Sequence, residues 1–442
     1  PIDELTTRCP HMAPPRRPTV VVRHCDGDGA AHTAWRSRYS SGATQTSDLA
    51  DIVREALLAR YAPPLGAERA SLEFVPLSCL LVPRNTSRSL GQFTVIDSWA
   101  DFGLRAMSPQ LQRVCTTVPS CVESSKLTLR DVAFLSTEVP AYLVSWNSSE
   151  SDVKPRFERA HFPSQLAMQG AFEFFQIPYA GAAHVGASSY PSASELLGER
   201  PILAALFANA VGAERGKLVG RSPLRTLLHA ECQRSSSAMC VLGGGERGSG
   251  GTLYRNSSWI LDGYRRSIFC LQPWGDTATR KGFWDAIAVG CVNVVFTQAG
   301  WNETDSWFGD HRDWTITVPL HAAIVNRGFG ANSSRVLDLL RAVPLARVRQ
   351  LQANVLAVRD RLQYSIAANA QNVDAVDVIV ERLAVHFARR RIRTAAAATA
   401  HQNGVTRDAN TTSLVTPRTL VQAHRRACSA LESLCRYQRT LV

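Results

Sequence analysis

The stretch 267–296 combines residue types that can bind a phosphate. An apolar run is followed by a tight loop and then by a helical pattern, which Thr277 or Thr279 can cap. The free N–H groups and the dipole at the start of such a helix attract an anion. Arg280 and Lys281 lie in its first turn, where cations oppose the dipole unless a negative ligand lies between them. These residues therefore predict a phosphate site at the carboxyl end of a strand.

The rest of this stretch fits a strand–helix–strand unit. The helix has an apolar stripe formed by Phe283, Trp284, Ile287 and Ala288. Asp285 lies one to two turns into the helix and can accept hydrogen bonds from ribose hydroxyls. Cys270 and Cys291 lie on the two flanking strands. They can form a disulfide or remain as two buried thiols, and the sequence favours neither alternative. An ordinary crossover helix has much the same pattern, so the residues alone leave both interpretations open.

Strands that alternate with helices along the chain predict parallel sheets with crossover helices. In the first half we expect a helix over 50–62, strands over 72–82, 93–96, 132–135 and 142–144, and a helix over 165–175. In the second half we expect strands over 202–208, 267–271 and 291–296, helices over 221–233, 279–289 and 373–387, and a helical stretch over 336–363 that Pro344 interrupts. The predicted domains are an irregular segment over 1–45, α/β domains over 46–199 and 200–388, and a basic tail with a terminal helix over 389–442.

Charge and sequons restrict the class of protein. The 49 Lys and Arg exceed the 37 Asp and Glu, which gives a net charge of +12 and favours anionic partners. Six N-x-Ser/Thr patterns begin at Asn85, Asn147, Asn256, Asn302, Asn332 and Asn410. Chance predicts about two such patterns, so their number favours the secretory pathway and argues against a nucleic-acid-binding protein. No basic-aromatic motif of the known RNA-binding modules is present either.

The secretory pathway permits disulfides. Close spacing makes Cys115–Cys121, Cys232–Cys240 and Cys428–Cys435 candidate pairs, although sequence alone does not establish the connectivity. No CxxC motif occurs, which argues against a structural zinc site. No run of about 18 apolar residues is present, and the chain begins at Pro1, so we expect a processed form whose signal or anchor has been removed.

The phosphate-site stretch resembles the signature of the exostosin-type glycosyltransferases, family 47, and within it the plant xyloglucan galactosyltransferase branch. That branch has FCLQPPGD, T-R-R, F-D and AGC-I/V-PV. Here the pattern is FCLQPWGD at 269–276, TRK at 279–281, WD at 284–285 and VGCVNV at 289–294. Flanking segments at 177–184, 206–215, 232–240 and 314–319 are also similar to the family, whereas Trp274 and Asn293 replace two of its prolines.

The resemblance implies a GT-B fold, with two Rossmann-like domains that contain parallel sheets. It implies inverting transfer of a sugar from a UDP-sugar to a polysaccharide or glycoprotein acceptor, with no cofactor and no obligatory metal. It also implies a Golgi lumen location, with a type II membrane anchor upstream of this sequence. Because the first domain matches the family poorly, a catalytically degenerate member that binds a glycan or a partner is the alternative.

Site residues follow from the resemblance position by position. The nucleotide-sugar site would contain Arg215, Gly275, Asp276, Thr277, Arg280 and Asp285. A general base must remove the proton of the acceptor hydroxyl. His184 and Glu173 are the candidates for that base, with His161 behind them.

Overall fold

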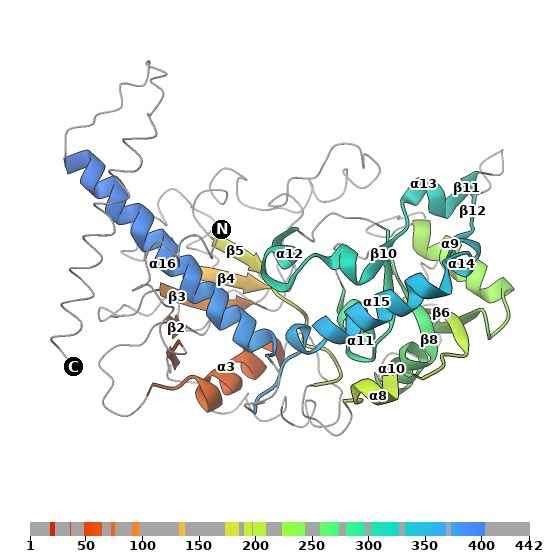
Figure 1. Cartoon of the computed structure of the whole chain (residues 1–442), viewed down its shortest axis with the longest axis horizontal. Coiled ribbons are helices and arrows are strands. Elements are labelled where there is room, and N and C mark those ends of the chain that lie inside the picture. Colours follow the sequence, from red (N-terminus) through yellow and green to blue (C-terminus); the bar gives the residue numbers. More distant parts are fainter. Residues whose placement is uncertain are drawn as a thin grey trace, which may run out of the picture.

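Two five-stranded parallel sheets organise the chain, one on the left and one on the right of Figure 1. Every strand pair within both sheets is parallel. These two α/β domains confirm the GT-B architecture expected from the sequence. The computed structural model describes residues 18–22, 36, 48–63, 72–75, 91–96, 132–137, 173–184, 190–196, 198–208, 223–243, 257–273, 280–296, 302–326, 332–367 and 373–402.

The first sheet follows chain order. It contains β1 (Val20–Val22), β2 (Leu72–Phe74), β3 (Gly91–Ile96), β4 (Val132–Ser136) and β5 (Glu173–Gln176). Helix α3 (Leu49–Arg60) packs against it with a buried apolar face, as its spacing predicts.

Two sequence expectations in this domain need correction. β1 lies in the segment predicted as irregular, because its valines favour a strand and pair with Leu72–Phe74. β5 lies at the end of the helix predicted over 165–175, because residues 173–176 pair with β4. The part of that predicted helix before 173 and the predicted strand at 142–144 lie outside the described residues.

The second sheet has the strand order β10-β9-β8-β6-β7. The chain adds β7 on one side of β6 and then returns to add β8 on the other side, so the strand order reverses between β6 and β8. The strands are β6 (Ile202–Phe207), β7 (Cys240–Gly243), β8 (Ser267–Gln272), β9 (Val292–Val295) and β10 (Thr315–Thr317). Helices α9 (Pro223–Arg234), α10 (Ser257–Arg266) and α11 (Lys281–Ala288) connect them. Apart from short shifts at their ends, β6, β8, β9, α9 and α11 confirm predicted elements, whereas β7, α10 and β10 were not predicted.

The remaining elements surround the second sheet. They are α8 (Ala193–Leu196), α12 (Asn302–Phe308), η6 (His311–Asp313), α13 (Leu320–Ala323), β11 (Ile324–Asn326), β12 (Asn332–Ser334), α14 (Val336–Arg341), α15 (Leu345–Val358) and η7 (Asp360–Leu362). Pro344 caps α15, which confirms the predicted break in this helical stretch.

Helix α16 (Ala375–Gln402) returns from the second sheet to the first and crosses over it (Figure 1). The Phe387 ring lies directly on Gly91 of β3, and His386 contacts the Phe175 ring of β5 with centroids 4.9 Å apart. The helix continues through 389–402, so the expected boundary between the second domain and a basic tail falls inside it. Among the described residues, no helix is both long enough and apolar enough to span a bilayer.

Two disulfides join described residues. Cys232–Cys240 connects the end of α9 to the start of β7 and confirms the predicted pair. Cys270 of β8 and Cys291, the residue before β9, also form a disulfide. Of the two alternatives that the sequence left for this pair, the structure therefore has the disulfide and not the two buried thiols. The predicted pairs Cys115–Cys121 and Cys428–Cys435 lie outside the described part of the chain.

Candidate functional site

The carboxyl edge of the second sheet provides the candidate site. In open parallel sheets, ligands bind at the carboxyl ends of strands where the strand order reverses. Here that point lies between β6, which ends at Phe207, and β8, which ends at Gln272. The first sheet follows chain order through its five described strands and has no such reversal.

Arg280 lies at this point of reversal. Its backbone is extended and forms the N-cap of α11, so the helix begins at Lys281 and not at the predicted Thr277 or Thr279, both of which lie outside the described residues. The Arg280 guanidinium donates a hydrogen bond to the Phe207 carbonyl, at the end of β6. Its buried Nη1 has no hydrogen-bond partner among the described residues, which leaves a cationic donor to bind an anion.

A buried polar pair holds the start of α11 on the sheet edge. Gln272 Nε2 donates to Asn293 Oδ1 at 2.9 Å and to the Gly282 carbonyl at 3.2 Å. Asn293 Nδ2 donates to the Phe283 carbonyl at 2.8 Å. Neither side chain had a predicted role, although each is a polar residue between apolar neighbours in the sequence. Asn293 thus supplies a side-chain contact to α11 that an apolar residue at this position could not make.

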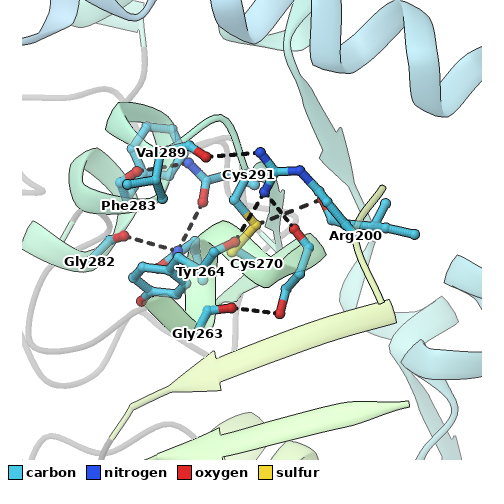
Figure 2. The surroundings of a disulfide bond; sticks show 12 residues. Arg200, Gly263, Tyr264, Cys270, Gly282, Phe283, Val289 and Cys291 are labelled. Carbon is cyan, nitrogen blue, oxygen red and sulfur yellow. Dashed lines mark hydrogen bonds between the residues drawn. A yellow bond between two sulfur atoms is a disulfide. The ribbon is translucent and has the colours of Figure 1, made fainter. Parts of the chain in front are cut away.

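The elements that carry the site are joined to one another near the Cys270–Cys291 disulfide, towards the amino end of β8 (Figure 2). Arg200 donates to the carbonyls of Ser267 and Val289, both at 2.9 Å, and to that of Tyr264 at 3.2 Å. Burial lowers the pKa of the Arg200 guanidinium to about 10, helped by the charge of Arg265, so it remains charged at neutral pH. It therefore ties α10, β8 and the end of α11 together.

Gly282 allows the close approach of Tyr264 and Arg280. A Cβ at this position would lie 2.8 Å from the Tyr264 hydroxyl and 3.2 Å from Arg280 Nη2. We expect Gly282→Ala to displace the guanidinium and to weaken ligand binding at the site about tenfold, since it misplaces one charged hydrogen bond. Adding Tyr264→Phe removes the clashing oxygen and should restore most of the affinity. Equal binding by Gly282→Ala and the parent protein, measured by calorimetry with UDP, would contradict this placement.

Asp285 lies on the other side of α11, against the chain that leaves the first sheet. Lys281 Nζ approaches its Oδ1 and Oδ2 at 3.0 and 2.9 Å, and the Ala182 N–H donates to Oδ1 at 2.6 Å. Only 6% of Asp285 is exposed. Both carboxylate oxygens are thus engaged within the protein, and the ribose contact stays a prediction.

His184 ends the same segment, near enough to Lys281 of α11 to feel its charge. Only 1% of it is exposed. Burial and then the charge of Lys281 lower the pKa of its imidazole to about 3, against the opposing effects of Asp48 and the Tyr364 backbone. An imidazole with this pKa is neutral at pH 7 and is a weak base, so its general-base role stays a prediction.

The other predicted site residues are not described in the same detail. Glu173 begins β5, and its side chain lies outside the description. Arg215, Gly275, Asp276, Thr277 and His161 lie outside the described residues altogether.

Asp305, Asp310 and His311 place their ligand atoms within 4.8 Å of one another. The Asp305 carboxylate already accepts hydrogen bonds from the His311 backbone and from its Nδ1, the latter at 2.8 Å. Asp310 accepts from Arg312 at 2.8 Å. We assign no metal to this group.

Part of the chain is similar to known proteins. Residues 154–329 match the Exostosin GT47 domain, a region that contains β5 to β11 and all of the candidate site. The probable xyloglucan galactosyltransferase GT19 of Arabidopsis thaliana is 31% identical over 126 residues, which are 26% of this chain and 27% of that protein. The probable xyloglucan galactosyltransferase GT17 of the same plant is 28% identical over 190 residues, 42% of this chain and 38% of that protein.

The chain therefore covers well under half of each relative, and it is exostosin-like over the matched segment. Among solved structures, the pneumococcal O-GlcNAc transferase GtfA in complex with UDP and GlcNAc aligns with a TM-score of 0.30 and 10% identity, over 72% of this chain and 56% of that one. A score this low places no residue, so the site rests on the geometry described above.

Proposed function

We propose that this chain is an inverting glycosyltransferase of exostosin type, which moves a sugar from a UDP-sugar to a polysaccharide or glycoprotein acceptor. The observation that carries the proposal is the position of Arg280 at the β6/β8 reversal. Its guanidinium is anchored to the Phe207 carbonyl, and its Nη1 has no partner within the described part of the chain and can bind an anion. The Exostosin GT47 match and the two xyloglucan galactosyltransferase relatives support the reaction class.

The chemistry explains why the site needs this cation. The acceptor oxygen bonds to the anomeric carbon of the sugar while the bond from that carbon to the β-phosphate oxygen of UDP breaks. Negative charge grows on the departing UDP, and Arg280 with the free N–H groups of α11 stabilises that charge. The acceptor proton passes to a base that the first domain supplies. No cofactor or metal is part of this proposal.

The proposed location is the lumen of the Golgi. Six sequons, the two disulfides and the relatives support a secretory-pathway enzyme. The net charge of +12 suits a UDP-sugar and acidic glycans.

The proposal is tested by a panel of UDP-sugars on the secreted protein, with binding measured by calorimetry and UDP release measured with and without glycan acceptors. We expect one UDP-sugar to bind at micromolar to millimolar concentration and to release UDP faster when its acceptor is present. UDP binding without turnover on any acceptor would favour the degenerate member, which binds but does not transfer. Failure of every UDP-sugar to bind at millimolar concentration would overturn the phosphate-site assignment.

A further inference from the structure

The chain crosses between the two domains twice, and both crossings are buried. The first, residues 177–184, leaves β5 on its way to β6, and every residue in it is buried. The second, residues 363–365, follows η7 and leads towards α16. The Tyr364 hydroxyl donates to the Pro178 carbonyl at 2.7 Å, so the two crossings lie side by side.

Both crossings are bonded to the middle of α11, the helix whose start carries Arg280. From the first crossing, the Ala182 N–H donates to Asp285. From the second, Gln363 Nε2 donates to the Trp284 carbonyl at 3.0 Å. The contacts meet at Gly181, where a Cβ would lie 2.6 Å from Gln363 Oε1 and 3.3 Å from Asp285 Oδ1.

The second crossing continues this connection into the first domain. Arg60 of α3 donates to the Ser365 carbonyl at 2.9 Å and to Asp374 at 2.7 Å. Asp374 in turn accepts the Ser365 N–H at 2.8 Å. A continuous series of buried polar contacts therefore runs from α11 through both crossings to α3.

We propose that Asp285 and Gln363 are positioning residues, which hold the start of α11 at a fixed place relative to the first domain. The inference rests on the proposed function, because it assigns the donor to α11 and the acceptor to the first domain. A rigid connection then sets the distance between the two reacting groups, and small displacements of such groups slow transfer strongly. The two residues act on the reaction through this distance and do not touch the donor.

The rival role for Asp285 is a contact with the donor ribose, and the two roles predict different results. Loss of a ribose contact weakens UDP binding in Asp285 variants and leaves Gln363 variants unaffected. Loss of positioning affects both residues alike and lowers kcat, while the Kd for UDP changes little. Gln363→Leu has nearly the same volume as the parent residue, and the exposed Gln350 on α15 supplies the matched control, Gln350→Leu.

The first measurement needs no catalytic activity. Amide hydrogen exchange of the segment 177–184 is compared in the full chain and in the Gln363→Leu, Asp285→Ala and Gln350→Leu variants. We expect exchange to be at least fivefold faster in the first two variants and unchanged in the control. Unchanged exchange in all three would show that α11 does not hold this crossing, and the inference would be wrong.

The second measurement separates binding from transfer. For Gln363→Leu and Asp285→Ala we expect the Kd for UDP to change less than threefold and kcat for transfer to fall at least tenfold, with Asp285→Asn partly restored because its Oδ1 still accepts the Ala182 N–H. A Kd that rises in parallel with the loss of transfer in Asp285 variants alone would establish the ribose contact and overturn the inference. If the parent protein itself does not bind UDP, the proposed function fails, and hydrogen exchange alone then decides whether α11 holds the crossing.

Discussion

Arg280→Ala should weaken UDP binding about 10- to 100-fold and lower kcat/KM for transfer by about 10²- to 10³-fold. A hydrogen bond to a charged group contributes about 1.5–3 kcal/mol to binding. A donor aimed at charge that develops in the transition state contributes about 2.7–4 kcal/mol to the rate. The larger effect is therefore expected on transfer. Calorimetry with UDP measures the change in affinity. Steady-state kinetics with the donor identified in the UDP-sugar panel measure the change in kcat/KM.

Two further variants make this result specific. Arg280→Lys retains the charge but lacks the planar fork that donates to Phe207 and the ligand together, so its affinity should lie between those of the parent protein and the alanine variant. Arg349→Ala removes an exposed arginine from α15 and should change neither quantity. An Arg280→Ala protein that is folded and binds UDP as tightly as the parent protein would refute the phosphate site.

Arg60→Ala should lower the free energy of unfolding by about 3–5 kcal/mol, because it leaves the buried carboxylate of Asp374 without its cation. Arg60 bonds both oxygens of Asp374 and also pairs with Asp377, and only 1% of its side chain is exposed. Burial acts to raise the pKa of Asp377, but the hydrogen bond from Tyr61 and the charge of Arg60 outweigh it and lower that pKa.

The matched control is Arg36→Ala, which removes an exposed cation from its pair with Glu55. Exposed pairs contribute about 0–1 kcal/mol, so this variant should unfold nearly as the parent protein does. Urea unfolding followed by circular dichroism measures both variants. A cost for Arg60→Ala no larger than that for Arg36→Ala would show that the pair does not hold α16 in place.

The strand–helix–strand unit that carries Arg280 was predictable because its residues are close in sequence. The strand, loop and helix of 267–296 carry their own turn residues and apolar stripe, and Arg280 lies at the sheet edge where that pattern predicts it. The helix start was less predictable, since two threonines and the residue after them offer similar caps. β5 was mistaken for a helix because residues 165–175 have helical spacing, whereas pairing with β4 is a long-range contact.

Contacts between residues far apart in the sequence could not be predicted. Ala182 and Asp285 are separated by 103 positions, and Arg60 and Asp374 by 314. A single sequence contains no local pattern that joins such residues. For the same reason the contact of Asp285 with the Ala182 N–H of the first crossing was not predicted.

The return of α16 has a consequence for how the protein is made. The first domain takes β1 from the start of the chain and its covering helix from residues 375–402. On the ribosome, domains usually fold in the order in which they emerge. Here the second domain can be completed first, while β3 and β5 must wait for Phe387 and His386 to be synthesised. The part of the first sheet that α16 covers therefore stays exposed throughout translation of the second domain, and we expect the nascent chain to be most prone to aggregation at this stage.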